Sequence, residues 1–191
     1  AWRNLVKNKT FSIINIAGLA IGLSCFLLIT MYVLDELSFD KYNDKADRIY
    51  RVNSDIRFGG TDLPLAVCSD PMGATLKKDY PDVEEFVRFY ASSGSKLIKK
   101  GNEWINENAV THADSTLFKV FTLPVISGDV NTALNEPNTV VITASAAKKY
   151  FGSQSPIGKR IRFGNDEEYE ITGVLRSPEN SHLKINFLFS Y

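Results

Sequence analysis

An uncharged apolar stretch near the N-terminus constrains this chain more than any other feature. Residues 11–34 read FSIINIAGLAIGLSCFLLITMYVL and contain no charged side chain. A helix of about two dozen residues spans about 36 Å, which is enough to cross a hydrocarbon core of about 30 Å. A buried core helix is seldom this long and apolar on every face, and the apolar region of a cleaved signal peptide is shorter, about 7–15 residues. The sequence therefore predicts a transmembrane helix over residues 11–34.

The charges on either side of this stretch predict its orientation. Arg3, Lys7 and Lys9 precede it without any acid, whereas Asp35 and Glu36 follow it directly. Because basic flanks stay on the cytoplasmic side of a membrane, the N-terminus is expected inside the cell. Residues 1–10 would then form a cytoplasmic juxtamembrane segment, and residues 35–191 would form a domain outside the cytoplasm.

The composition excludes some classes of partner. The 191 residues contain 22 Lys plus Arg and 22 Asp plus Glu, so the formal net charge is zero. Without a basic field, nucleic acid is not an expected partner. Cys25 lies inside the apolar stretch and Cys68 lies after it, so we expect neither a disulfide between them nor a metal site that includes them. The roughly 155 residues after the helix suffice for one domain or two small subdomains.

One face of the predicted membrane helix carries small residues. Gly18 and Gly22 form a GxxxG pair, and Asn15 lies near the same face at helical spacing. Small residues let two helices approach closely, and an asparagine can form a hydrogen bond across such a contact. The motif is common by chance, but it predicts that Asn15, Gly18 and Gly22 pack against another transmembrane helix.

The rest of the chain mixes strand and helix patterns, with Gly and Pro residues between them. The expected strands are residues 48–53, 86–90, 96–100, 103–106, 110–113, 139–142, 159–163 and 169–175. The expected helices begin near residues 69–70, at 115 and at 144, and end before 81, at 121 and at 151. The expected fold class is α+β, with a single N-terminal transmembrane helix followed by a mixed α+β domain.

Local signals predict where several of these elements begin and end. Asp70 is expected to cap the first helix of the domain, with Pro71 at its first position. Thr143 is expected to cap the last helix, and Gly152 is expected to end it. Gly101-Asn102 is a typical hairpin turn between two of the strands.

The sequence predicts no catalytic, cofactor-binding or metal-binding residue, and an enzyme is not expected. The segment Gly152–Lys159 looks like a phosphate-binding loop, but it has five residues between its glycines instead of four, and Arg160 replaces the Ser or Thr that binds magnesium. The two histidines, His112 and His182, have no partner at metal-ligand spacing. Ser181 precedes His182, but the sequence places no acid to orient that base.

Many short stretches, in order along nearly the whole chain, carry a family resemblance. They are WRNL (2–5), NK (8–9), INIAGLAIG (14–22), DELSFD (35–40), DRIYRV (47–52), FKVF (118–121), SGD (127–129), AL (133–134), EP (136–137), VVIT (140–143), AAKKYFG (146–152), PIGK (156–159), ITGV (171–174) and PENSHL (178–183). Together they resemble the MacB/FtsX family of ABC transporter permeases. The resemblance implies one membrane helix and a MacB-like periplasmic core domain of two subdomains, at the bacterial inner membrane.

The same resemblance implies a function and a set of partners. The chain would be part of a permease subunit that transmits ATPase-driven motion to a periplasmic domain, for export or extraction of a substrate. ATP hydrolysis would reside in a partner ABC ATPase subunit or domain, so no cofactor is expected in this chain. A second permease copy and membrane lipid are further expected partners, and a periplasmic adaptor and an outer-membrane channel are compatible with the family.

The resemblance also gives the N-terminal residues a place, and it implies more chain than is printed. Trp2, Arg3 and Lys7 are expected at the cytoplasmic interface, near where an ATPase could dock. In such permeases the chain continues into three more membrane helices, so we expect a continuation beyond Tyr191. The substrate is not predicted.

Two other classes of protein share the predicted topology. A single-pass receptor with an extracytoplasmic sensing domain would also have one helix and one folded domain, but it needs a second span that leads to a cytoplasmic output domain. A membrane-anchored enzyme is disfavoured, since the sequence contains no recognisable catalytic set.

Overall fold

The computed structural model describes residues 7, 9–91, 96–164, 167–176 and 180–191. The chain divides into two compact units, residues 1–39 and residues 40–191. Each unit is described separately below.

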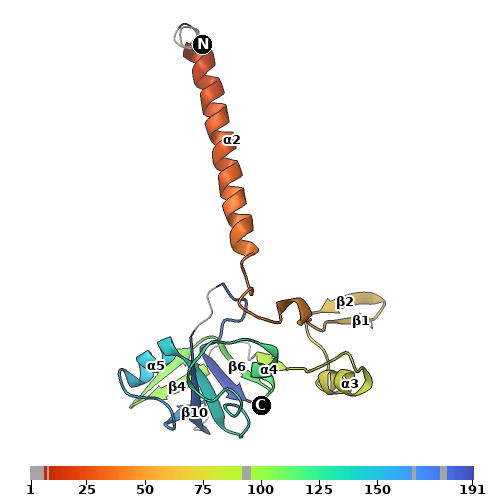
Figure 1. Cartoon of the computed structure of the whole chain (residues 1–191), viewed down its shortest axis with the longest axis vertical. Helices are drawn as coiled ribbons and strands as arrows, with labels where there is room; N and C mark the ends of the chain where they lie inside the picture. Colours follow the sequence, from red (N-terminus) through yellow and green to blue (C-terminus); the bar gives the residue numbers. More distant parts are fainter. Residues whose placement is uncertain (1–6, 8, 92–95, 165–166, 177–179) are drawn as a thin grey trace. The chain divides into compact units, whose positions relative to one another are not determined.

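The first unit is dominated by one long helix, α2 (Lys9–Glu36; Figure 1). It extends the predicted span by two residues at each end, and its large apolar side chains are exposed on every face. Two of its polar side chains bond to the helix backbone: Ser24 Oγ donates to Ala20 O (2.8 Å) and Thr30 Oγ1 donates to Phe26 O (2.8 Å). Among the described residues, α2 is the one helix long and apolar enough to cross a membrane.

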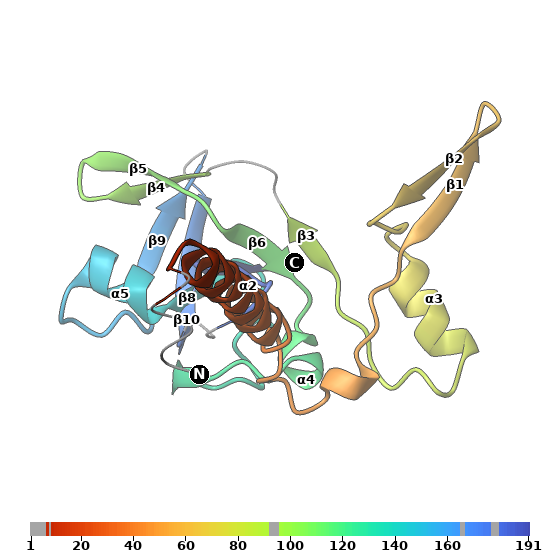
Figure 2. The same ribbon diagram turned by 90° about the horizontal axis from the view of Figure 1, so that it is seen from above.

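The second unit is built on a mixed nine-stranded sheet (Figure 2). Along the sheet, eight strands follow in the order β3 (Phe89–Ala91), β6 (Val110–Ala113), β11 (Phe187–Ser190), β8 (Thr139–Thr143), β10 (Glu167–Leu175), β9 (Arg160–Phe163), β4 (Lys96–Lys100) and β5 (Glu103–Glu107). The ninth, β7 (Val125–Gly128), pairs with β10. The pairs β10–β8 and β11–β6 are parallel and the others are antiparallel. Three short helices complete the unit: α3 (Met72–Asp79), α4 (Leu117–Val120) and α5 (Ala144–Phe151).

The core lies on both faces of the central strands. In β11, Phe187 and Phe189 belong to one buried cluster and Leu188 belongs to another, as the alternation of side chains along a strand requires. Helix α5 covers the first cluster with Ala146, and α4 covers the second with Leu117. Strands that are buried on both faces read as continuous apolar runs, which explains the sequences VVI in β8 and FLF in β11.

The structure confirms the predicted α+β class and the locally determined elements. Strands β4 and β5 form a hairpin around Gly101-Asn102, and β9 and β10 are antiparallel neighbours. Helix α5 has the predicted ends: the Thr143 side chain accepts a hydrogen bond from Ala146 N (3.3 Å), and Gly152 follows the helix with φ 62°.

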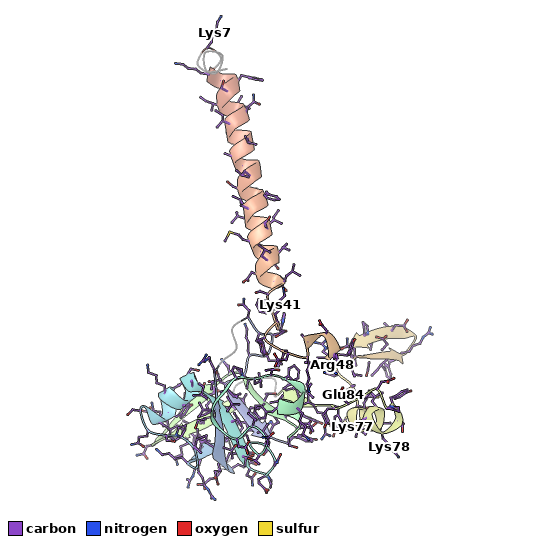
Figure 3. The ribbon with its side chains drawn as sticks, viewed as in Figure 1. Lys7, Lys41, Arg48, Lys77, Lys78 and Glu84 are labelled. Carbon is purple, nitrogen blue, oxygen red and sulfur yellow. The ribbon has the colours of Figure 1, made fainter. Side chains whose placement is uncertain are left out.

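The predicted strand at residues 48–53 is wrong. Residues Ala46–Arg48 form a 3₁₀ helix, and the strand of this region is β1 (Ser54–Phe58), which pairs with β2 (Thr61–Leu65). Arg48 instead makes an exposed ion pair with Glu84 (2.9 Å; Figure 3). The apolar–polar alternation of residues 48–53 therefore lacks the neighbouring strand that it would need.

The N-terminal cap predicted for α3 is also wrong. Pro71 is the capping residue and makes no side-chain cap, while the Asp70 carboxylate accepts a hydrogen bond from Arg88 Nη1 (3.2 Å). Arg88 precedes β3, so that strand begins later than predicted, at Phe89. Strands β1, β2, β7 and β11 were not predicted from the sequence.

The hairpin β1–β2 has two chemically different faces. Its register places Ile56 opposite Leu63 on one face and Arg57 opposite Asp62 on the other. Phe58, on the apolar face, is 77% exposed. The hairpin is therefore amphipathic, and its apolar face is open in this structure.

Candidate functional site

A polar cluster of the second unit surrounds its first residue, Asp40, which directly follows the helical unit in the sequence. Asp40 has φ 57°, a left-handed conformation that aspartate tolerates better than most residues. Its backbone N–H donates to Asn180 O (2.9 Å). Its carboxylate accepts from Ser181 Oγ (3.2 Å) and His182 N (3.2 Å), and it contacts His182 Nδ1 at 2.7 Å. Asp40 is therefore bonded to the loop between β10 and β11 through both its backbone and its side chain.

Tyr42, two residues after Asp40, makes a second contact with the same loop. Its hydroxyl lies 2.8 Å from Ser181 Oγ, and Ser181 Oγ also accepts from Leu183 N (3.1 Å). Ser181 is buried, and the Tyr42 side chain packs against the apolar cluster that α4 covers. The attachment thus combines hydrogen bonds with contact to the core.

Asn43 connects this segment to a second loop, between α4 and β7. It is buried, its Oδ1 accepts from Thr122 N (3.0 Å), and its Nδ2 donates to Asp40 O (3.3 Å). Nearby, Asp44 N donates to Thr122 Oγ1 (3.2 Å) and Lys45 Nζ donates to Lys119 O (2.8 Å). Residues 40–45, which we call the junction segment, are thus bonded to two loops that lie far away in the sequence.

Asp40, Ser181 and His182 are the residue types of a hydrolase triad, but their contacts follow a different order. In a triad the histidine lies between the serine and the acid. Here the Asp40 carboxylate lies between the other two and bonds to both. The sequence alone placed no acid beside His182, and the fold brings Asp40 to it. The arrangement attaches two segments of chain to each other.

Two further charged clusters connect elements of the second unit. The Arg88 guanidinium donates to both oxygens of Asp114 (2.7 and 3.0 Å), and this hydrogen-bonded pairing raises the pKa of Arg88. The buried Glu107 on β5 accepts from Tyr150 Oη (2.7 Å) and Lys149 Nζ on α5. Burial and the Glu107 contact raise the pKa of Tyr150. Both clusters make structural connections between elements.

The predicted helix-packing residues are all available for contact. Asn15, Gly18 and Gly22 are exposed on α2, and a Cβ atom added at either glycine would meet no atom within 4 Å. Lys7 is exposed at the start of the described chain, whereas Trp2 and Arg3 lie outside the described residues (Figure 3). The roles predicted for these residues stay predictions.

The segment that looks like a phosphate loop serves as a turn. Gly158 N donates to Ile171 O (2.8 Å), and Lys159 Nζ donates to Gln154 Oε1 (2.5 Å). Cys25 and Cys68 are free and exposed. Within the described part of the chain, no three His, Cys, Asp or Glu residues are grouped so that they could hold a metal ion.

The sequence analysis singled out no residue of the junction segment as functional. A signal was nevertheless present, because Asp40 ends the stretch DELSFD and Ser181-His182 belong to PENSHL. Both are among the stretches that carry the family resemblance. Asp40 and His182 are 142 residues apart, so their pairing depends on the fold.

Comparisons with known proteins give the family. The family model for the MacB-like periplasmic core domain matches residues 12–189. Among solved structures, a domain of a putative permease protein from Porphyromonas gingivalis is 24% identical with a TM-score of 0.52, covering 62% of this chain and 55% of that one. The periplasmic region of MacB from Actinobacillus actinomycetemcomitans is 22% identical with a TM-score of 0.45, covering 62% and 53%.

A third solved structure, the extracellular domain of the ABC-type transporter YknZ from Gram-positive bacteria, is 23% identical with a TM-score of 0.37, covering 50% and 49%. The chain thus matches about half the length of each of these structures. A search of curated proteins found no match. The family match covers the apolar helix and the sheet domain together, so the chain belongs to the family of the MacB-like periplasmic core domain, the MacB/FtsX type of ABC transporter permease.

Proposed function

We propose that this chain is part of a permease subunit that transmits ATP-driven motion across the inner membrane to its periplasmic domain, for export or extraction of a substrate. In this proposal α2 crosses the membrane with Lys7 on the cytoplasmic side. The observation that carries the proposal is that one family model spans both the apolar helix and the domain, residues 12–189. A match that covers both helix and domain supports a function that uses the two together.

The proposal assigns the chemistry and the assembly to partners. An ABC ATPase subunit or domain would hydrolyse ATP in the cytoplasm, and a second permease copy would complete the membrane part. The face of α2 with Asn15, Gly18 and Gly22 would pack against another helix, and lipid would cover the rest. A periplasmic adaptor and an outer-membrane channel fit the same scheme.

The orientation is tested with cysteine labelling by a membrane-impermeant maleimide in spheroplasts. Cys68 is exposed in the sheet domain and should react without permeabilisation. A Lys7→Cys variant that also carries Cys68→Ser should react only after permeabilisation. The opposite labelling pattern would reverse the proposed topology.

The assembly is tested with the complete protein and its ATPase, purified together and reconstituted in liposomes. Gly18→Leu with Gly22→Leu should lower recovery of the complex and its ATP hydrolysis, because bulky side chains prevent close helix contact. Ala20→Leu, on the opposite side of the helix, is the matched control. If both sets of variants assemble and hydrolyse ATP like the wild type, the helix-packing role is wrong. Failure of the permease to associate with any ATPase would refute the proposed function itself.

A further inference from the structure

We infer that Asp40 is the positioning residue through which movement of the membrane helix reaches the central strands of the sheet. The inference rests on the proposed function, and it concerns the residue that couples the two parts. It requires only the covalent link between residues 39 and 40, because every contact it uses lies within residues 40–191.

Asp40 has the contacts that such a role needs. Four contacts join it to three consecutive residues, Asn180, Ser181 and His182. Three of them use its carboxylate, and the contact with His182 Nδ1 (2.7 Å) has the length of a charge-assisted hydrogen bond. A displacement of Asp40 is therefore passed to this loop in a defined direction.

The residues that Asp40 contacts lie shortly before a central strand of the sheet. Residues 183–186 separate His182 from β11, which pairs with β6 and β8. This strand contributes Phe187, Leu188 and Phe189 to the core. Since packed cores deform little, a shift at this loop moves the strands as a body.

The second attachment of the junction segment leads to another strand of the same sheet, β7. Asn43 binds Thr122, and the residues that follow Thr122 lead into β7, which pairs with β10. Arg176 N, just after β10, donates to Pro124 O (2.8 Å). The Asn43 side chain makes one neutral hydrogen bond to this loop, whereas the Asp40 carboxylate contacts three groups. We therefore assign the principal coupling to Asp40 and a supporting role to Asn43.

The inference is tested on the complete permease with its ATPase in liposomes, with Cys25→Ser and a spin label on Cys68. The distance between the labels of the two permease copies is measured by electron spin resonance, without nucleotide and with ATP under conditions that block hydrolysis. ATP hydrolysis is measured in parallel. In the wild type we expect a nucleotide-dependent change of distance. In Asp40→Ala most of that change should be lost while ATP hydrolysis persists, because the motor runs but its motion no longer reaches the sheet.

Four further variants separate coupling from simple stability. Asp44→Asn is the matched control, since it is an acid of the same segment whose backbone N–H makes the contact, and it should behave like the wild type. Asp40→Glu keeps the charge and should restore part of the distance change, whereas Asp40→Asn should not. Asp40→Asn combined with His182→Gln should be no worse than Asp40→Asn alone, because both changes break the same contact.

The outcomes distinguish an error in the proposed function from an error in the role of Asp40. If the wild-type distance does not respond to nucleotide, the proposed function is wrong and the role of Asp40 falls with it. If the wild type responds and Asp40→Ala responds equally, only the inference about Asp40 is overturned. An Asp40→Ala protein that loses its near-ultraviolet circular dichroism has unfolded. In that case the nucleotide-dependent change of distance is compared between Asp40→Asn and Asp40→Glu. Equal changes in these two variants also overturn the inference.

Discussion

The replacement Phe189→Ala should remove a large part of the stability of the sheet domain. Phe189 lies on β11 and is fully buried, and its ring centroid is 4.3 Å from that of Phe163 and 4.5 Å from that of Tyr169. A buried aromatic side chain removes about 150–250 Å² from water, which at about 25 cal/mol/Å² gives an upper limit of about 4–6 kcal/mol. Measured Phe→Ala costs in cores are about 3–5 kcal/mol, and we expect a loss of that size. Total stabilities are about 5–15 kcal/mol, so the effect is large.

Phe58→Ala provides a control with the same chemistry and a different environment. Phe58 lies on β1 and is 77% exposed, so its replacement should change the free energy of unfolding by less than about 0.5 kcal/mol. Both variants are made in the complete chain in detergent micelles. Urea unfolding is then followed by near-ultraviolet circular dichroism, which reports the packing of the aromatic side chains.

The test is the difference in the free energy of unfolding between Phe189→Ala and Phe58→Ala. If Phe189→Ala costs no more than Phe58→Ala, β11 is not a central strand and the sheet order is wrong. Phe189→Leu keeps most of the apolar volume and should lose less than Phe189→Ala. It yields a measurable transition even if the alanine variant fails to fold.

Three further predictions follow from local geometry. Gly128→Ala should destabilise the domain by more than Gly101→Ala, as measured by urea midpoints. Both glycines have positive φ. A Cβ at Gly128 would lie 2.3 Å from Thr172 O, whereas a Cβ at Gly101 would meet nothing within 4 Å. Thr143→Ala should cost about 1 kcal/mol through loss of the helix cap, measured in the same way. Burial lowers the pKa of His112 below its ordinary 6.5, so the unfolded chain takes up this proton first and stability falls as the pH drops below about 6.5. His112→Gln should flatten that part of the pH–stability curve, and an unchanged curve would contradict the assignment.

The elements that the sequence predicted well are those whose causes lie within a few residues. Thr143 and Gly152 bracket α5 because a cap and a left-handed glycine act on the adjacent turn of helix. The turn at Gly101-Asn102 sets the β4–β5 register for the same reason. The apolar helix α2 needs only length and composition, which are also local properties.

The errors occurred where a distant part of the chain decides the structure. The alternation in residues 48–53 is a strand pattern without a neighbouring strand, and the Asp70 carboxylate binds Arg88 instead of the helix end. Strand β11 was not predicted because a run of four buried residues is too short to be distinguished from a helical segment without knowledge of its partner strands. Its parallel neighbour β6 and its antiparallel neighbour β8 lie far away in the sequence. Periodicity alone cannot supply such pairings.

The chemical nature of the junction segment bears on what it can transmit. Apolar burial is non-directional, so it does not by itself favour one direction of displacement over another. Hydrogen bonds weaken steeply when their distance or angle changes, so they oppose displacement in defined directions. Asp40 and Asn43 bind two different loops through such bonds, and these loops precede β11 and β7, two strands of the same sheet. An attachment whose only task was stability could be made of apolar contacts, whereas one that must pass on a movement needs direction, which this polar cluster provides.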